Sequence, residues 1–371
     1  MDFSYHMPTK VEFGPGVIEG LARHIEEMGA SSALIVTGKS SMKKTGILRR
    51  VEGLCEGIDV SVFDKVEPDP SLATVDDGAK AAEGCDIIIA LGGGSPLDAA
   101  KGISAAVGND ATADQVLYKN RIKRAGPPII AIPTTSGTGS EVTQVSVLTD
   151  REKMVKKSFR AEHIYPAVAL DDYELTSSMP QKITAQTGLD ALSHALEALV
   201  STRSQPISDV LCIEAAKLVL ENLEGAYEFG DDMSFRREMM LASLMAGFGI
   251  TVAGAGLSHG LSYGLWRVTG AGHGLAVGML TPHVIRYNLG HDGGKYERVA
   301  KAAGFEGTEK LIEAIERMND RLGVPKTLSD MGVGQDDLGT LVDASLAGSA
   351  KTNPRKVDKR SAKKFTEGIR G

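Results

Sequence analysis

The sequence predicts a protein of two domains, in which an α/β domain with a parallel sheet precedes an all-helical domain. Three observations support this fold class. The chain of 371 residues is longer than one domain with a single hydrophobic core, since domains usually hold about 100–200 residues. In the first half, short apolar runs alternate with helical patterns, which is typical of a parallel sheet covered on both faces. After about residue 172, long helical periodicities replace the strand pattern.

Continuous apolar runs predict the strands of the first half, at residues 33–37, 60–63, 86–91 and 129–132. A basic, serine-rich helix is expected to begin after Gly38. Ser71 is placed to cap a helix over residues 71–83, which has Asp76 and Asp77 in its early turns. Strands that alternate in this way with helices form a parallel sheet.

Amphipathic periodicity predicts the helices of the second half, at residues 181–200, 206–224, 234–254, 256–266, 273–289, 294–303, 308–321 and 337–348. A turn at residues 176–180 marks the boundary between the domains. We therefore assign residues 1–176 to the α/β domain and residues 177–371 to the helical domain. The basic cluster near the C-terminus is interpreted as a solvated helix face, because no aromatic residues are interleaved with it.

Composition and charge narrow the partners and the compartment. A net charge of −7 disfavours nucleic acid, because phosphate backbones require a basic face. The cysteines, Cys55, Cys85 and Cys212, are too few and too far apart for a disulfide scaffold. The N-terminus does not resemble a signal peptide, and no uncharged apolar run reaches the roughly 20 residues that span a bilayer. We expect a cytoplasmic protein that does not enter membranes.

A glycine-rich turn follows the predicted strand at 86–91, with the sequence Gly92-Gly93-Gly94-Ser95-Pro96-Leu97-Asp98. We expect Ser95 to cap a helix, with Pro96 as its first residue and Asp98 as its third, in a capping box. Glycine lets the backbone approach a ligand closely, and the free N–H groups at a helix start bind anions. The turn therefore predicts a pyrophosphate site.

A second loop, rich in hydroxyl groups, follows the predicted strand at 129–132 and reads Pro133-Thr134-Thr135-Ser136-Gly137-Thr138-Gly139-Ser140-Glu141. Ligands of open α/β sheets bind at the carboxyl ends of the strands, where we expect both loops to lie. Either loop alone could be a simple turn, but two at one edge favour a ligand site. Neither loop has the P-loop or the GxGxxG pattern, which disfavours those two nucleotide-binding classes.

One acidic residue and three histidines form a candidate metal site. Asp190 and His194 stand four residues apart in a predicted helix, so they share a face. His259 and His273 stand fourteen residues apart, and each is followed by glycine. Each residue alone is more often a packed or surface group than a ligand. Together they form a complete ligand set for Fe²⁺ or Zn²⁺.

These motifs, in this order, resemble those of the iron-containing (group III) alcohol dehydrogenase family. The resemblance spans nearly the whole chain, and it includes KVEFGPG at residues 10–16, LDDYELT at 170–176 and TNPR at 352–355. It implies a dehydroquinate synthase-like fold, with an N-terminal dinucleotide-binding domain, a C-terminal helical metal-binding domain and a metal site in the cleft between them. It also implies a homo-oligomer, which we expect to be a dimer.

The resemblance implies a role for each motif residue. The metal ligands would be Asp190, His194, His259 and His273, and they would hold Fe²⁺, with Zn²⁺ as the alternative. The residues around the cofactor would be Gly93, Gly94 and Ser95 at the pyrophosphate, Asp98 near the nicotinamide, Thr134, Thr135 and Thr138 in the groove, and Lys156 near the nicotinamide ribose. Asp69 lies in a matching segment in which the family commonly has asparagine.

The implied activity is a metal-dependent, NAD(P)-linked alcohol dehydrogenase or aldehyde reductase. Hydride would move between the nicotinamide C4 and a small alcohol or aldehyde whose oxygen is bound to the metal, which stabilises its developing charge. Three alternatives stay open. Tyr263 motivates a hydroxyacid–oxoacid transhydrogenase. A cyclase or lyase of the dehydroquinate synthase type is disfavoured by the few basic residues near the metal motif. A nucleotide sensor is disfavoured by the complete ligand set.

Besides Asp69, two further positions depart from the family pattern. Many members have a histidine, proposed to relay a proton, four residues after the first glycine-flanked ligand, and Tyr263 stands there. We expect Tyr263 to act in catalysis beside His273 or to form a pocket wall. Gly38 stands where many relatives have an aspartate that accepts the ribose hydroxyls. Gly38 removes that charge, and Lys39 and Ser40 follow it, which predicts a preference for NADP(H) over NAD(H).

Overall fold

The computed structural model describes residues 2–119, 121–346 and 348–371, and the chain divides into two compact units. The α/β unit contains residues 6–135 and 139–178. The helical unit contains residues 179–371 together with the short segments 2–5 and 136–138, within the described ranges. The segment 136–138, which lies in the hydroxyl-rich loop, therefore groups with the helical unit although it interrupts the sequence of the α/β unit.

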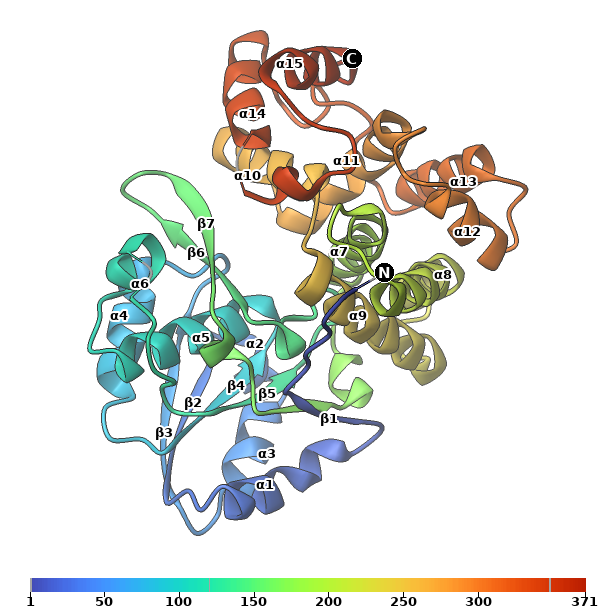
Figure 1. Cartoon of the computed structure of the whole chain (residues 1–371). Helices are drawn as coiled ribbons and strands as arrows, with labels where there is room; N and C mark the ends of the chain where they lie inside the picture. Colours follow the sequence, from blue (N-terminus) through green and yellow to red (C-terminus); the bar gives the residue numbers. More distant parts are fainter. Residues whose placement is uncertain (1, 120, 347) are drawn as a thin grey trace. The chain divides into compact units, whose positions relative to one another are not determined.

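Strands and helices alternate in the α/β unit, as predicted (Figure 1). The main sheet contains β1 (Lys10–Phe13), β2 (Ser32–Gly38), β3 (Asp59–Val66), β4 (Ile87–Gly92), β5 (Ile129–Pro133) and β8 (Val168–Asp171). The α-helices are α1 (Leu21–Glu27), α2 (Ser41–Lys44), α3 (Ile47–Leu54), α4 (Leu72–Ala81), α5 (Gly94–Gly108) and α6 (Ala113–Lys119). A separate antiparallel hairpin contains β6 (Val145–Asp150) and β7 (Val155–Arg160).

The main sheet is parallel, with the strand order β1-β8-β5-β4-β2-β3. The order reverses beside β2, because the chain runs outward from β2 to β3 and then returns to β4 on the other side of β2. Thr37 pairs with Leu91, and Gly92 pairs with Pro133, so β2, β4 and β5 end at one edge. Ligands of open α/β sheets bind at such a reversal. The glycine-rich turn and the hydroxyl-rich loop start from this edge, as predicted.

Both faces of the main sheet are buried. In β4, Ile88 and Ala90 face the core formed with α4, α5 and α6. Ile87, Ile89 and Leu91 face the core formed with α1 and α3. Alternate residues of a strand point to opposite faces, so a strand covered on both sides is apolar throughout. This confirms the parallel sheet predicted from continuous apolar runs.

The second unit is helical, as predicted. Its α-helices are α7 (Gln181–Val200), α8 (Pro206–Glu228), α9 (Met233–Ala253), α10 (Leu257–Thr269), α11 (His273–Asn288), α12 (Lys295–Ala302), α13 (Thr308–Arg321), α14 (Leu338–Ser345) and α15 (Lys359–Gly368). Residue 347, within the predicted helix 337–348, lies outside the described residues. One large apolar cluster, with most of its residues on these helices, forms the core of the unit.

Helix α9 ends at Gly254, which has φ of +74°, and the chain then turns into α10. Glycine adopts this positive φ without the steric penalty of a Cβ atom. Among the described residues, no single helix is long and apolar enough to cross a membrane. Helices α9 and α10 together have the length and apolar composition of a membrane span, but they are bent by 99° at the break between them.

Candidate metal centre and cofactor loops

Helix α7 places two of the predicted metal ligands on one face. Asp190 and His194 lie one helical turn apart, and their relative exposures are 4% and 7%. Glu197 follows on the same face and is 4% exposed. Buried charged and polar groups need partners, so this polar stripe in an otherwise apolar helix points to a specific interaction.

The other two predicted ligands stand at helix starts. His259 is the third residue of α10, and His273 is the first residue of α11. The glycine after His273 has a packing role, because a Cβ atom on Gly274 would lie 2.0 Å from the carbonyl oxygen of Gln186 in α7. The start of α11 therefore lies directly against α7, which brings His273 to the polar stripe.

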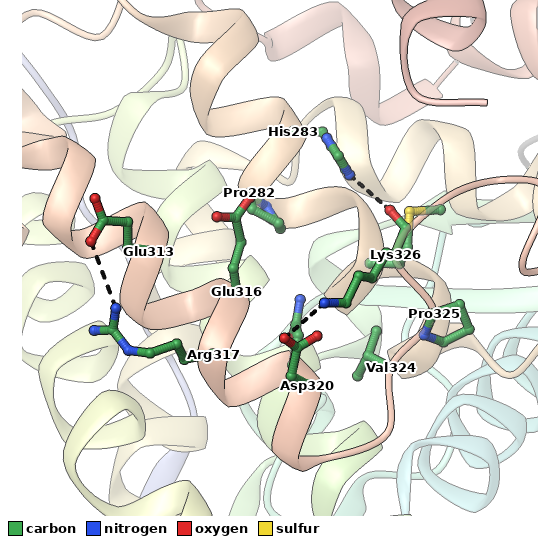
Figure 2. Close-up of a pocket in the computed structure, with 11 residues that line it drawn as sticks. Pro282, His283, Glu313, Glu316, Arg317, Asp320, Val324, Pro325 and Lys326 are labelled. Carbon is green, nitrogen blue, oxygen red and sulfur yellow. Dashed lines mark hydrogen bonds and ion pairs between the residues drawn. The ribbon is translucent and has the colours of Figure 1, made fainter. Parts of the chain in front are cut away.

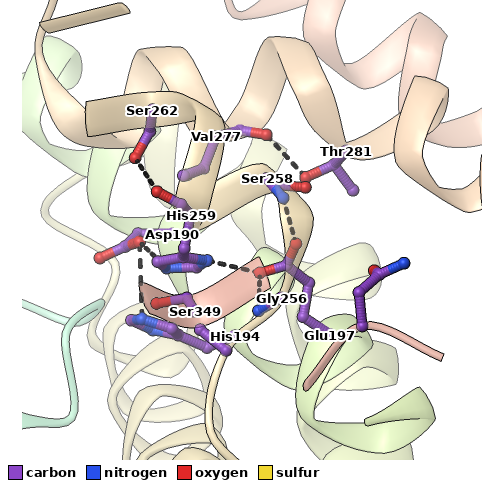
Figure 3. Close-up of polar contacts among 12 residues, drawn as sticks. Asp190, His194, Glu197, Gly256, Ser258, His259, Ser262, Val277, Thr281 and Ser349 are labelled. Carbon is purple, nitrogen blue, oxygen red and sulfur yellow. Dashed lines mark hydrogen bonds and ion pairs between the residues drawn. The ribbon is translucent and has the colours of Figure 1, made fainter. Parts of the chain in front are cut away.

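The Nε2 atoms of the three histidines converge on one carboxylate oxygen. His259 Nε2 and His273 Nε2 each lie 3.4 Å from Asp190 Oδ1, and His194 Nε2 lies 3.8 Å from it. Potential ligand atoms of Asp190, His259 and His273 all lie within 4.8 Å of one another. Ligand atoms about 2.1 Å from one tetrahedral ion are about 3.4 Å apart, so the spacing of these three residues fits a common ion, whereas His194 lies outside this closest group. Figure 3 shows Asp190, His194 and His259 grouped in this way.

The second ring nitrogen of His259 contacts Glu197. His259 Nδ1 lies 2.6 Å from Glu197 Oε2, and the N–H groups of Gly256 and Ser258 donate to the same carboxylate at 2.7 and 2.5 Å (Figure 3). Burial alone would raise the pKa of Glu197, but the charge on His259 and these hydrogen bonds hold that pKa below its usual value. An ionised carboxylate only accepts, so Nδ1 carries a proton and Nε2 faces Asp190.

The other two histidines are oriented in the same manner. His194 Nδ1 lies 3.3 Å from the carbonyl oxygen of Gly137, which can only accept. Ser262 Oγ donates to the His259 carbonyl at 2.8 Å, so it accepts from His273 Nδ1 at 3.2 Å. In all three rings, therefore, Nδ1 holds the proton and Nε2 is directed to Asp190. Fixing the tautomer through the distal nitrogen is characteristic of histidines that bind metals.

Among the described residues, Asp190 Oδ1 and His259 Nε2 are buried without a hydrogen-bond partner. Burial favours a raised pKa for Asp190, but the imidazoles of His194 and His273 outweigh it and hold the pKa well below its usual value. Burial lowers the pKa of His194 to about 4, so its ring is neutral at pH 7. A carboxylate beside imidazole nitrogens suits Fe²⁺ or Zn²⁺, and a cation would satisfy the two buried atoms.

His259 differs in its proton affinity. Burial would lower its pKa, but the carboxylates of Glu197 and Asp190 raise it to about 9. Without a bound metal, the ring therefore holds its second proton, on Nε2, more strongly than a free imidazole does. Since only the deprotonated Nε2 binds a metal, binding of a cation releases a proton from His259.

The glycine-rich turn leads into α5 earlier than expected. The helix begins at Gly94 with Gly93 as its N-cap and no side-chain cap, so the prediction that Ser95 caps it was wrong. Gly92 has φ of +141°, and a Cβ atom there would lie 2.8 Å from Pro96 Cγ. This sharp bend starts the helix two residues sooner. The N–H groups of its first turn have no partner within the helix and can bind an anion.

Asp98 does not form the predicted capping box. Its carboxylate accepts hydrogen bonds from Ser140 Oγ at 2.7 Å and from the N–H of Val147 at 2.9 Å. Asp98 thus ties α5 to the end of the hydroxyl-rich loop and to β6.

The two loops touch within the α/β unit. The N–H of Thr134 donates to the carbonyl of Gly92 at 2.9 Å, and a Cβ atom on Gly93 would lie 3.1 Å from Thr135 Oγ1. Thr138 belongs to the segment 136–138, which groups with the helical unit. The structure therefore brings Thr134 and Thr135, but not Thr138, to the glycine-rich turn within this unit.

Three further predicted cofactor residues meet at the start of α5. The N–H of Asp69 donates to Ser95 Oγ at 3.2 Å, and Lys156 Nζ in β7 lies 2.7 Å from Asp69 Oδ1. Asp69 has φ of +58°, a conformation that aspartate and asparagine tolerate better than most residues. Burial lowers the pKa of Lys156. A cation and a hydroxyl thus stand at the helix start where an anion would bind.

Gly38 ends β2 at the same edge, and Lys39 and Ser40 after it are exposed. A Cβ atom on Gly38 would lie 3.7 Å from a carbonyl oxygen of β3, so a side chain fits there. The basic helix predicted after Gly38 is only the single turn α2, and Lys43 in it pairs with Asp64. The start of α2 therefore contributes less to phosphate binding than expected, and the positive charge near Gly38 comes from Lys39.

Tyr263 lies one turn after His259 on α10 and is half-buried. Its ring stacks near that of His273, with centroids 6.2 Å apart and an interplanar angle of 30°. The position four residues after His259 therefore adjoins a predicted metal ligand, and it presents a phenol.

A separate cavity of about 450 Å³ lies between α11 and α13 (Figure 2). None of the predicted site residues lines it. Its charged groups pair with one another: Lys326 lies 2.9 Å from Asp320, and Arg317 lies 3.7 Å from Glu313. These pairs leave little charge to anchor a ligand. The group of candidate metal ligands around Asp190 is therefore the stronger candidate site.

Glu197 contacts the candidate ligand His259 and was not among the residues predicted from the sequence. The signal was present, because Asp190, His194 and Glu197 follow the i, i+4, i+7 spacing of one helix face. An acidic residue on the helix face that carries two candidate ligands is well placed to accept a hydrogen bond from a third candidate ligand.

The chain is similar to known proteins over nearly its whole length. Residues 8–173 match the family model for iron-containing alcohol dehydrogenase, and residues 184–367 match the C-terminal model of the same family. The 1,3-propanediol dehydrogenase of Klebsiella pneumoniae is 36% identical over 95% of each chain. The NADPH-dependent butanol dehydrogenase of Clostridium saccharobutylicum is 34% identical over 98% of this chain and 97% of the relative.

A solved structure resembles the whole chain. The sulfoacetaldehyde reductase of Bifidobacterium kashiwanohense in complex with NAD⁺ superposes with a TM-score of 0.93. It is 32% identical and covers 100% of this chain and 99% of its own. The match extends over both the α/β and the helical parts of the sequence.

Proposed function

Because the chain belongs to the iron-containing alcohol dehydrogenase family and is therefore an NAD(P)-linked oxidoreductase of alcohols and aldehydes, we propose that it binds a divalent metal through Asp190 and three histidines. The histidines are His194, His259 and His273. One observation carries the proposal: three Nε2 atoms converge on Asp190 Oδ1, a buried atom without a hydrogen-bond partner among the described residues. We propose Fe²⁺ as the ion, with Zn²⁺ as the alternative that suits the same ligands.

A bound divalent ion supplies a Lewis acid that stabilises negative charge on the oxygen of the alcohol or aldehyde. Asp190 contributes the negative charge of the ligand set, and His194 contributes a neutral ring. Glu197, Ser262 and the Gly137 carbonyl keep the three Nδ1 protons away from the ion. Asp190, His194 and His259 are buried, and the low local dielectric strengthens the electrostatic interactions among them.

The nicotinamide cofactor would bind at the carboxyl edge of the main sheet. The backbone of Gly93, Gly94 and Ser95 would hold the pyrophosphate at the start of α5. Asp69 and Lys156 support this placement, because their contacts bring a buried cation to that helix start. The remaining residues proposed for the groove are Asp98, Thr134, Thr135 and Thr138.

Removal of single ligands tests the metal site. Asp190→Ala and His259→Ala should each lose bound metal and lower kcat/KM on the order of 10³-fold, because the Lewis acid contributes several kcal/mol. NADPH binding, measured by fluorescence, should survive. His283→Ala is the matched control, since His283 lies on α11 with His273 but outside the cluster. Full metal occupancy in either ligand variant would contradict the assignment.

Steady-state oxidation of free NADPH by an aldehyde would separate this activity from that of a transhydrogenase.

We also propose that the enzyme prefers NADP(H) to NAD(H). Gly38 offers no carboxylate to repel a 2′-phosphate, and the exposed Lys39 beside it can pair with one. Relatives include both an NADPH-dependent and an NAD⁺-bound enzyme, so the preference depends on this chain's own residues.

Gly38→Asp tests the cofactor preference. The new side chain fits sterically, and its charge should weaken NADPH binding by about 1–3 kcal/mol through repulsion of the phosphate. The measurement is kcat/KM for both cofactors in both proteins. A wild type that favours NADH, or a variant with an unchanged ratio, would overturn the proposal. Gly53→Ala, at another glycine of the α/β unit with open space around it, controls for a general effect of side-chain addition.

We propose further that the enzyme acts in the cytoplasm as a homo-oligomer, with a dimer as the expected form. The three cysteines are free thiols in the structure, which suits a reducing compartment. Light scattering on the purified protein would measure the oligomeric state.

A further inference from the structure

We infer that Glu197 is a positioning residue that couples α7 to α10 and holds His259 in the orientation and tautomer in which Nε2 binds the metal. The inference deepens the proposed function and rests on the ligand set proposed above. Glu197 itself does not contact the predicted ion, since its carboxylate is turned to the opposite nitrogen of the His259 ring.

The carboxylate of Glu197 makes contacts of two kinds. Oε2 lies 2.6 Å from His259 Nδ1 and accepts the N–H of Gly256 at 2.7 Å. Oε1 accepts the N–H of Ser258 at 2.5 Å. Gly256 is the N-cap of α10, and Ser258 is its second residue. One buried side chain therefore caps the helix that carries His259 and also orients the ring of His259.

The arrangement depends on a close approach of the backbone to the carboxylate. A Cβ atom on Gly256 would lie 3.0 Å from both Cδ and Oε1 of Glu197. Only glycine leaves room for the carboxylate at this distance without displacement. Because Glu197 shares one face of α7 with Asp190 and His194, a single helix supplies two ligands and the support of a third.

Loss of the carboxylate has a defined consequence for the ligand. Without a charged acceptor at Nδ1, the His259 ring can rotate or move its proton to Nε2, which then no longer binds a cation. The carboxylate also increases electron donation from the imidazole. Partners of this kind typically contribute 10–100-fold to metal affinity.

The test compares Glu197→Gln with the wild type in the full-length protein. The dissociation constant for Co²⁺ is measured by competition with a chelator, and the visible spectrum of the Co²⁺-loaded protein reports the coordination geometry. We expect the dissociation constant to rise about 10–100-fold and the spectrum to change, while NADPH binding stays at the wild-type value.

Asp232→Asn is the matched control for helix capping. Asp232 is the N-cap of α9, its carboxylate accepts the N–H of Ser234 at 2.8 Å, and it touches none of the proposed ligands. Asp232→Asn loses the same charge at a helix start but keeps an oxygen that accepts the Ser234 N–H, so its melting temperature measures the effect of the lost charge alone. Its Co²⁺ affinity and spectrum should not change. A purely structural role for Glu197 would give the same pattern in both variants.

Gly256→Ala provides a second variant if Glu197→Gln does not fold. Its methyl group displaces the carboxylate without changing its chemistry, and it should weaken Co²⁺ binding and alter the spectrum in the same direction. His259→Ala separates the two proposals. If His259→Ala abolishes Co²⁺ binding while both other variants keep the wild-type affinity and spectrum, the role of Glu197 is refuted and the ligand set stands. If His259→Ala binds Co²⁺ normally, the ligand set itself is wrong.

Discussion

Tyr263 and His273 illustrate how one substitution changes the proton chemistry of a site. The two rings are stacked with centroids 6.2 Å apart, so the side chain at position 263 adjoins a proposed metal ligand. A free tyrosine titrates near pH 10 and a free histidine near pH 6.5. A free phenol therefore remains protonated across the neutral range, whereas a free imidazole gains and loses a proton there.

We predict that the pH profile of hydride transfer changes with this residue. The wild type and Tyr263→Phe should lack a titration near neutrality, and Tyr263→His should gain a limb near pH 6.5, at about the free histidine value. The measurement is kcat against pH with a deuterated alcohol, whose isotope effect identifies the hydride step. A near-neutral limb that persists in Tyr263→Phe would place the proton relay elsewhere. Tyr263→Phe is also the control, because it keeps the ring beside His273.

Close helix packing determines the geometry of the site at the level of the elements. The ligands come from α7, α10 and α11, and α11 approaches α7 at Gly274. The obstacle to a side chain there is the backbone of Gln186, which has no rotamers with which to move aside. The histidine–glycine pairs of the sequence therefore combine a ligand with the glycine that brings its helix close.

We predict that Gly274→Ala separates α11 from α7. Overpacking of this kind commonly destabilises a protein by about 1–3 kcal/mol, and His273 should move from Asp190 and weaken metal binding. Urea unfolding and metal titration measure the two effects. Gly339→Ala on α14 is the control: its Cβ atom would meet nothing within 4 Å, so it should stabilise the helix by about 0.5–1 kcal/mol. Unchanged metal affinity in Gly274→Ala would show that helix separation does not control the site.

At the scale of the whole molecule, the metal ligands and their supporting acceptors all belong to the helical unit. This includes Gly137, whose short segment, 136–138, groups with that unit although its neighbours in sequence belong to the α/β unit. The α/β unit has separate apolar cores on the two faces of its main sheet. Each unit thus has its own source of stability.

Metal removal should therefore destabilise the helical unit selectively. With free metal at about a hundred times its Kd, binding stabilises the folded state by about 3 kcal/mol, which chelation removes. Hydrogen exchange should become faster in α7, α10 and the start of α11, while β4 and β5 keep their protection. Exchange in the metal-loaded protein serves as the reference. An equal loss of protection in β4 would contradict a metal effect confined to one unit.

Local sequence patterns were sufficient to predict several elements of the fold. The apolar runs of β2, β4 and β5 follow from burial on both faces, and the polar stripe of α7 follows from its periodicity. Ser71 caps α4 as predicted, because this hydrogen bond joins residues only three positions apart. The order of motifs along the chain also sufficed for the family, and with it for the two-domain fold.

Features that depend on partners distant in the sequence could not be predicted from local patterns. The edge strand β1 was not predicted, because it alternates Lys10 and Glu12 with apolar residues and carries no buried run. The start of α5 depends on the contact between Gly92 and Pro96 across a bend. Glu197 and His259 lie 62 positions apart and meet only once α7 and α10 pack together. Periodicity reports the neighbours of a residue along its own helix, whereas hydrogen-bond partners on other helices are chosen by packing.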